Sequence, residues 1–284
     1  MPRIDINGIG IAYDIIGEGD KTVAITAGGR FSKDTPGLRE LAGHLADAGF
    51  KALIWDRVNC GESDVNFDGE TESLMNADML GGLLRALDFG PTLLVGGSAG
   101  SRVSLMTAIR NPDLVSGLFL LWISGGPLGL STLAIFYHHE SALAARMDGM
   151  AAVANLPEWK EQVTRNLGNR DRFLAWDTEE FVAVMQRWAD SFYPKSDAPV
   201  PGLDPAQLAA IKCPVKVLRS GKSDIHHPRE TSEALAAMIP GSQLVEPPWG
   251  PNEWNDGFRE PDNSRRFHSF EKLAPMVIDF ANSL

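Results

Sequence analysis

The sequence predicts an α/β fold: a mostly parallel central sheet with helices on both faces and a helical segment inserted into it. Short apolar runs typical of buried strands alternate with stretches whose apolar residues recur at helical spacing. Residues 124–212 interrupt this alternation without a clear buried strand. The chain has 284 residues, 44% of them apolar, which is enough to bury a sizeable core.

The first part of the chain supplies most of the expected strands. Residues 4–16 read as two short strands joined at Asn7-Gly8, a pair typical of a tight hairpin turn. The remaining elements follow in order: a strand at 22–26, a helix at 38–48, a strand at 51–55, a helix at 72–87, a strand at 91–95, a helix at 102–110 and a strand at 117–123.

The last part of the chain returns to the alternating pattern, with strands expected at 213–219 and 242–246. The intervening residues are rich in Ala, Met, Trp and Arg, and they end in a proline-rich stretch typical of a linker. The sequence therefore predicts a core α/β domain formed by residues 1–126 and 206–284, with residues 127–205 as a helical cap.

Composition restricts the possible partners. A formal net charge of −11 argues against binding to nucleic acid or to an anionic membrane. The two cysteines, Cys60 and Cys213, are far apart and no metal-ligand spacing is present, which indicates free thiols and no metal. The start of the chain lacks the apolar segment of a secretory signal, and no window is apolar enough to span a bilayer, so we expect a cytoplasmic protein.

A serine stands at an expected junction between a strand and a helix. The run Gly96–Gly100 reads Gly-Gly-Ser-Ala-Gly and follows the strand at 91–95. Small residues two positions before and after the serine let a strand and a helix approach closely around a strained turn. Ser98 is therefore the candidate nucleophile.

This junction, the order of the elements and the loop Trp-Asp-Arg-Val-Asn-Cys-Gly-Glu-Ser at residues 55–63 resemble the α/β-hydrolase superfamily over nearly the whole chain. The resemblance implies that backbone amides near the first long strand help to hold an oxyanion, for which a glycine-rich turn allows close approach. We assign the amides of Gly29 and Ala99 to this role.

The same resemblance suggests which residues surround these amides. Gly28 is expected to form the turn that carries Gly29. Arg30 and Phe31, which follow it, are expected to line the floor of the substrate pocket.

A serine hydroxyl needs a base, and the base needs an orienting acid. In the superfamily the acid follows the nucleophile and the histidine comes last. The loop at 220–228 resembles the acid-bearing loop, with Asp224 at the matching position. The other position that sometimes carries the acid reads Ser124-Gly125-Gly126 and offers no carboxylate.

The chain departs from the superfamily pattern at the histidine. Residues 245–254, after the last expected strand, contain no histidine where the superfamily has Gly-His. His226 and His227 lie on the acid loop itself, and His268 opens the final helix. We favour His227 and retain the other two as alternatives. The base must lie within hydrogen-bond reach of the Ser98 hydroxyl and face a carboxylate with its other nitrogen.

The sequence thus predicts a serine hydrolase that cleaves a small-molecule carboxylic ester or lactone through an acyl-enzyme, without a cofactor. Segments 26–30, 96–102 and 246–250 also resemble esterases of macrolide antibiotics, which implies a bulky lactone. The absence of the usual histidine motivates a second hypothesis, a ligand receptor or lyase on the same fold. No Gly-x-Gly-x-x-Gly turn follows the early strands, which argues against a dinucleotide cofactor.

Overall fold

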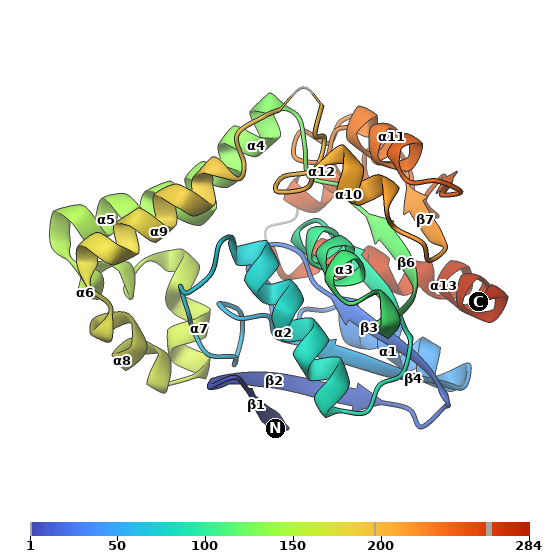
Figure 1. Cartoon of the computed structure of the whole chain (residues 1–284), viewed down its shortest axis with the longest axis horizontal. Coiled ribbons are helices and arrows are strands. Elements are labelled where there is room, and N and C mark those ends of the chain that lie inside the picture. Colours follow the sequence, from blue (N-terminus) through green and yellow to red (C-terminus); the bar gives the residue numbers. More distant parts are fainter. Residues whose placement is uncertain (1, 196, 260–262) are drawn as a thin grey trace.

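The computed structural model describes residues 2–195, 197–259 and 263–284. Its core is an eight-stranded sheet with the strand order β1-β2-β4-β3-β5-β6-β7-β8 (Figure 1). The strands are β1 (Arg3–Ile6), β2 (Ile9–Ile16), β3 (Lys21–Thr26), β4 (Phe50–Trp55), β5 (Thr92–Gly97), β6 (Val115–Leu121), β7 (Val215–Leu218) and β8 (Gln243–Val245). The pairings of β1 with β2 and of β2 with β4 are antiparallel, and the others are parallel. The expected mostly parallel sheet is confirmed.

Helices cover both faces of this sheet because its strands are apolar on both sides. Side chains alternate between the faces along β3: Val23 and Ile25 belong to the apolar cluster under α1 (Leu38–Asp47) and α13 (Ala274–Ser283), and Ala24 belongs to the opposite cluster. The opposite face is covered by four further helices, namely α2 (Glu72–Ala86), α3 (Ala99–Arg110), α10 (Pro205–Ala209) and α11 (Arg229–Met238).

The long connection between β6 and β7 is mainly helical and extends to one side of the sheet (Figure 1). We call its first six α-helices the cap helices: α4 (Pro127–Ala134), α5 (Glu140–Asp148), α6 (Met150–Val153), α7 (Lys160–Arg165), α8 (Gly168–Ala175) and α9 (Thr178–Asp190). A π-helical turn, Ile135–His139, joins α4 to α5. The chain closes with α12 (Glu253–Arg259), a 3-10 segment (Asn263–Leu273) and α13.

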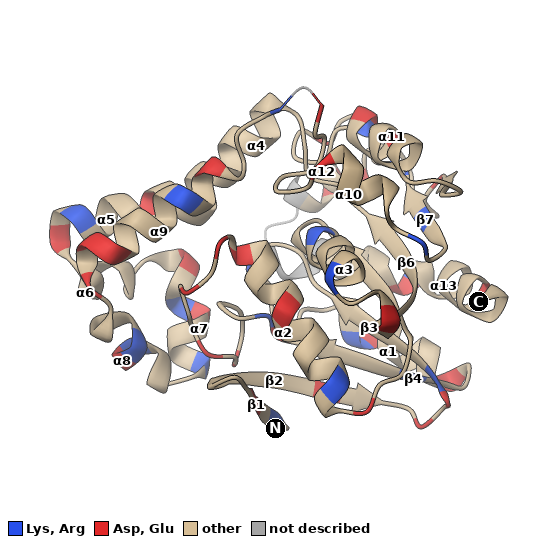
Figure 2. Cartoon of the chain, viewed as in Figure 1, with Lys and Arg blue, Asp and Glu red and all other residues tan. Residues whose placement is uncertain are grey.

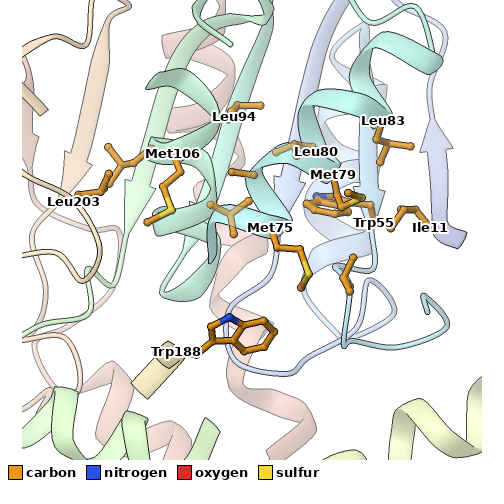
Figure 3. Packing of buried hydrophobic residues seen from close by; sticks show 14 of the residues in the cluster. Ile11, Trp55, Met75, Met79, Leu80, Leu83, Leu94, Met106, Trp188 and Leu203 are labelled. Atoms are coloured by element: carbon orange, nitrogen blue, oxygen red, sulfur yellow. The ribbon is translucent and has the colours of Figure 1, made fainter. Parts of the chain in front are cut away.

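The apolar core is continuous between the sheet and the cap helices. Phe67, in the loop between β4 and α2, is fully buried, and its ring centroid lies 4.8 Å from that of Phe181 and 5.7 Å from that of Trp159. Figure 3 shows Trp188 of α9 in the same cluster as Met75 of α2. Complete burial of a large aromatic side chain stabilises a fold by about 1.5–3 kcal/mol. The cap helices are therefore packed onto the core as well as joined to it by the chain.

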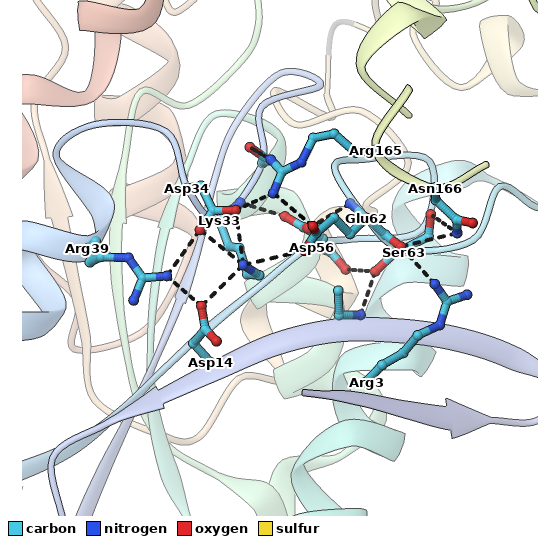
Figure 4. Close-up of polar contacts among 12 residues, drawn as sticks. Arg3, Asp14, Lys33, Asp34, Arg39, Asp56, Glu62, Ser63, Arg165 and Asn166 are labelled. Atoms are coloured by element: carbon cyan, nitrogen blue, oxygen red, sulfur yellow. Dashed lines mark hydrogen bonds and ion pairs between the residues drawn. The ribbon is translucent and has the colours of Figure 1, made fainter. Parts of the chain in front are cut away.

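A network of charged residues fastens the cap helices to the loops beside the sheet (Figure 4). Asp56, just after β4, accepts hydrogen bonds from the backbone N–H groups of Lys33 (2.6 Å) and Glu62 (2.8 Å). Arg165 of α7 donates to Ser32 Oγ at 2.9 Å and forms an ion pair with Asp34. These contacts hold together the loops after β3 and β4.

The two carboxylates of this network respond differently to their surroundings. Burial raises the pKa of Asp56 to about 6. Burial would also raise the pKa of Asp34, but hydrogen bonds from Arg165, Lys33 and Arg39 overcome this effect and lower it to about 2. Asp34 therefore stabilises the folded chain in its ionised form.

The turn between β5 and α3 is tightly enclosed. Ser98 has φ 56° and ψ −116°, a strained conformation for a residue with a side chain. A Cβ atom at Gly100 would lie 2.1 Å from the carbonyl oxygen of Thr26, and one at Gly96 would lie 2.4 Å from that of Gly100. Only glycine fits at these two positions, because the neighbouring atoms belong to the backbone.

We expect Gly100→Ala to lower the free energy of unfolding by more than about 3 kcal/mol, or to yield no soluble protein, because the added methyl group clashes with the β3 backbone. The control is Gly43→Ala in α1, where an added Cβ meets nothing within 4 Å. A helical Gly→Ala change of this kind stabilises by about 0.5–1 kcal/mol. Urea denaturation measures both variants, and wild-type stability of Gly100→Ala would contradict the tight turn.

We expect Arg165→Ala to lower the free energy of unfolding at pH 7 by about 1–2 kcal/mol, because it removes one cation from a partly buried network. The folded-state pKa of Asp34 is depressed, so its contribution is present above about pH 4 and is lost as the pH falls towards 2. The difference between wild type and variant should accordingly shrink on acidification. Arg146→Ala, which removes an exposed ion pair with Glu179, is the matched control and should change stability by less than about 0.5 kcal/mol. Equal effects of the two substitutions would argue against the network.

Candidate active site

Ser98, His227 and Asp224 form a continuous chain of hydrogen bonds at the carboxyl ends of the parallel strands. Nε2 of His227 lies 2.9 Å from Oγ of Ser98, and Nδ1 of His227 lies 2.8 Å from Oδ2 of Asp224. All three residues are buried. With the imidazole proton on Nδ1, the lone pair of Nε2 accepts the hydroxyl proton of Ser98. This arrangement meets the geometric requirement for activation of a serine hydroxyl.

A single loop after β7 carries both the acid and the base. Oδ1 of Asp224 accepts hydrogen bonds from the backbone N–H groups of His226 and His227, each at 3.0 Å. The N–H of Gly125, after β6, donates to the carbonyl oxygen of His226 at 3.2 Å. The Asp224 carboxylate thus shapes the loop with one oxygen and contacts the His227 imidazole with the other.

The structure brings only one of the three histidine alternatives to Ser98. The ring of His226 points elsewhere, and its Nδ1 accepts a hydrogen bond of 3.4 Å from Nε1 of Trp254. His268 is exposed. His227 is the histidine in contact with Ser98.

Aromatic side chains surround the imidazole, and the sequence analysis did not assign them. The ring of Trp254 meets His227 edge-on at a centroid distance of 4.5 Å, and Trp122 lies on another side at 6.3 Å. Trp254 is the second residue of α12 and the last residue of the segment 245–254, where the superfamily has its histidine. That segment therefore contributes a packing surface for the imidazole that comes from the neighbouring loop.

Glu253 lies beside Trp254 and is another unassigned residue near the site. Oε1 of Glu253 accepts a hydrogen bond of 2.5 Å from Oγ of Ser269. Burial, with the Asp224 carboxylate nearby, raises the pKa of Glu253 to about 7. Its carboxyl group is thus partly protonated at neutral pH, which limits the negative charge next to Asp224.

Gly29 and Ala99, expected to supply the oxyanion-binding amides, line one small pocket together. Gly28 lies against the Ser98 turn, because a Cβ on Gly28 would fall 2.8 Å from both the Gly97 carbonyl oxygen and Cβ of Ser98. Gly29 has a φ of +53°, which favours glycine. The loop after β3 thus approaches the Ser98 turn as closely as a glycine-rich backbone allows.

Arg30 and Phe31, expected at the floor of the substrate pocket, are not among the residues that line the small pocket shared by Gly29 and Ala99. The Arg30 guanidinium donates to Oε1 of Glu72 at 2.7 Å and lies 4.0 Å from the Trp159 ring centroid. Phe31 packs against Phe267 at 5.0 Å. Glu72 of α2 pairs with the buried Arg30 guanidinium, which also donates to the carbonyl oxygen of Tyr137 at 3.1 Å.

The pocket contains two other arginines instead. It has room for about one water molecule, and its remaining lining residues are Arg57, Glu72, Ser73, Asn76, Arg102 and Tyr137. Nη2 of Arg57 donates to the carbonyl oxygens of Gly28 (3.2 Å) and Gly29. Nη1 of Arg102 donates to Oγ of Ser124 at 2.8 Å. No local motif marks either arginine, although Arg102 lies one helical turn after Ser98.

The cap side of the site holds a buried, unpaired imidazole. His138, in the π-helical turn, is fully buried, and neither of its ring nitrogens has a hydrogen-bond partner. Burial lowers the pKa of His138 to about 3, although Glu72 acts in the opposite direction. Burial also raises the pKa of the neighbouring Tyr137. His138 is therefore neutral at pH 7, and the charge around the pocket resides on the arginines and Glu72.

Two further properties concern the described part of the chain. Within it, no three His, Cys, Asp or Glu side chains are grouped in a way that could hold a metal ion. Nor does any helix there combine the length and apolarity needed to cross a bilayer.

Comparison of the sequence with known proteins identifies related hydrolases. A family model described as the alpha/beta hydrolase fold matches residues 32–190, more than half of the chain. A 2-hydroxy-6-oxo-6-phenylhexa-2,4-dienoate hydrolase from Comamonas testosteroni is 30% identical over 126 residues, and the match covers only 44% of this chain and 43% of that enzyme. The serine hydrolase BPHL of Homo sapiens is 22% identical over 269 residues, which cover 92% of this chain and 83% of that protein.

Solved structures share the fold over the whole chain. An esterase from Thermogutta terrifontis has a TM-score of 0.64 at 23% identity, covering 100% of this chain and 99% of that chain. An enol-lactonase from Burkholderia xenovorans LB400 has a TM-score of 0.63 at 19% identity, covering 99% and 100%. At these identities the likeness shows the fold alone. Taken with the family model, it establishes that the chain belongs to the alpha/beta hydrolase family.

Proposed function

We propose that this protein is a serine hydrolase that cleaves a carboxylic ester or lactone through an acyl-enzyme. The observation that carries the proposal is the position of His227, with Nε2 at 2.9 Å from Oγ of Ser98 and Nδ1 at 2.8 Å from Asp224. A base that contacts a serine hydroxyl on one side and a carboxylate on the other is the arrangement needed to make serine nucleophilic at neutral pH.

Each residue of the site has a defined step in this mechanism. Oγ of Ser98 attacks the substrate carbonyl carbon while Nε2 of His227 takes its proton, and Asp224 stabilises the imidazolium that forms. The amides of Gly29 and Ala99 bind the oxyanion of the tetrahedral intermediate. His227 then gives its proton to the departing alkoxide, leaving an ester between the acyl group and Ser98. A water molecule, activated by His227, hydrolyses that ester and restores Ser98.

The ester and lactone class is favoured over a receptor or lyase on the same fold. The absence of a histidine from residues 245–254 motivated that second hypothesis, and His227 on the acid loop supplies an imidazole in contact with Ser98. The fold relatives described above include an esterase and an enol-lactonase, which is consistent with acyl transfer.

The pocket favours a compact acyl group over a macrolide-sized one. Beside Gly29 and Ala99 there is room for about one water molecule. A bulky lactone would need more space beside these two amides than this pocket provides. We propose accordingly that small esters and lactones are the natural first substrates to assay.

We expect Ser98→Ala and His227→Ala each to lower kcat for p-nitrophenyl acetate by about 10³-fold or more, because each removes a part of one catalytic unit. His226→Ala and His268→Ala are the matched controls, since neither imidazole contacts Ser98. They should retain kcat within a few-fold of wild type. Steady-state kinetics, measured on purified variants that have equal melting temperatures, tests these expected values of kcat. Full activity of Ser98→Ala would refute the mechanism, and a loss confined to His226→Ala or His268→Ala would assign the base differently.

A further inference from the structure

We propose that Arg102 binds a carboxylate group of the substrate, so that the enzyme acts on esters or lactones with a free carboxylate a short distance from the scissile carbonyl. This inference rests on the proposed function, because it places the carboxylate relative to Ser98 as the nucleophile. It names a substrate class within the broader group of esters and lactones.

Arg102 reaches the pocket from the first turns of α3 and lies close to the nucleophile. Its Nη1 donates to Oγ of Ser124 at 2.8 Å, and that oxygen is 3.4 Å from Oγ of Ser98. One hydroxyl group therefore separates the guanidinium from the serine. A substrate group bound to Arg102 would therefore lie only a few covalent bonds from the substrate carbonyl carbon that Ser98 attacks.

Arg102 is buried without a direct ion-pair partner among the described residues, although Glu72 lines the same pocket. Its exposed fraction is 3%, and no carboxylate forms an ion pair with it within the described residues. Its hydrogen-bond acceptors are the hydroxyls of Ser124 and, at 3.3 Å, Ser73. Burial lowers the pKa of Arg102 to about 10, so it still carries its charge at neutral pH. Burying a charge without an ion-pair partner lowers the stability of the fold, so a buried arginine of this kind is a candidate for binding an anionic ligand.

Among the three arginines that are buried in the described part of the chain, two lack an ion-pair partner, and both line this pocket. Arg30 is also buried, but it is paired with Glu72 at 2.7 Å. Arg57, beside Arg102, meets only the carbonyl oxygens of Gly28 and Gly29. Elsewhere, acidic and basic residues are interspersed along the helices (Figure 2). The pocket therefore holds an excess of buried positive charge in a chain whose net charge is −11.

A carboxylate fits this environment in charge and in hydrogen-bonding geometry. A guanidinium binds a carboxylate through two parallel N–H···O bonds, which are among the stronger polar interactions in proteins. The Phe192 ring, 5.0 Å from Cζ of Arg102, covers the guanidinium from the cap side and limits access of water.

The decisive experiment compares two esters of the same length that differ in one terminal group. p-Nitrophenyl butyrate ends in a methyl group, and mono-p-nitrophenyl succinate carries a carboxylate in its place. We expect wild-type kcat/KM to be at least about tenfold higher for the succinate, since a charge-assisted pair gains more than about 1.4 kcal/mol. Arg102→Gln, which retains hydrogen bonding but loses the charge, should lower the ratio of succinate to butyrate about 10- to 100-fold. Arg102→Lys should restore part of it.

Arg110→Gln is the matched control on the same helix. Arg110 is exposed and pairs with Asp78 on the surface, so its loss should leave the substrate ratio unchanged. An Arg102→Gln variant with the wild-type ratio would overturn the proposal. A wild-type enzyme that prefers the butyrate would overturn it equally.

A binding measurement separates failure of this proposal from failure of the proposed function. Calorimetry on Ser98→Ala should show tighter binding of monomethyl succinate than of methyl butyrate, by at least about tenfold. This measurement needs no Arg102 variant and no turnover. Equal affinities would reject the carboxylate site while leaving the serine mechanism in place. Selective succinate binding, combined with no turnover of either ester by the wild type, would retain the site and reject the mechanism.

Discussion

The site depends on one constraint, the close contact between the Ser98 turn and the two neighbouring strands. Gly96 and Gly100 have no side chains, so the start of α3 can pack against the backbone of β3. That contact sets the strained φ of Ser98 and places Ala99 in the same pocket as Gly29. Ser98, the proposed nucleophile, and the two proposed oxyanion donors are thus positioned by rigid elements, which is what preorganised catalysis requires.

The second organising feature is the loop after β7, where acid and base lie only three residues apart. The Asp224 carboxylate accepts two backbone N–H groups and contacts the His227 imidazole, so one side chain fixes both the loop and the base. Residues 245–254, where the superfamily usually has its histidine, contain none. This segment supplies Trp254, which packs against His227, and Glu253, which is partly protonated at neutral pH. The hydrogen-bonded arrangement of Ser98, His227 and Asp224 is therefore formed with a histidine from the loop after β7 instead of the segment after β8.

The sequence predicted what local pattern determines. Apolar runs located the strands to within about two residues, since burial on both faces of a parallel sheet leaves an unbroken apolar signature. Ser98 and Asp224 stand out through their neighbours in the chain. The sequence favoured His227 but left His226 and His268 as alternatives, because the choice depends on the path of a loop in space. The pairing of Arg30 with Glu72 was not predicted for a similar reason, since the two residues are distant in sequence.

The central claim, that His227 activates Ser98 for nucleophilic attack, is tested most directly by covalent labelling with a fluorophosphonate, read by intact mass and peptide mapping. We expect the wild type to gain one adduct on the peptide that contains Ser98, and His227→Ala to label at least about 10³-fold more slowly. Absence of an adduct on the folded wild type would contradict the account. So would labelling of His227→Ala at the wild-type rate.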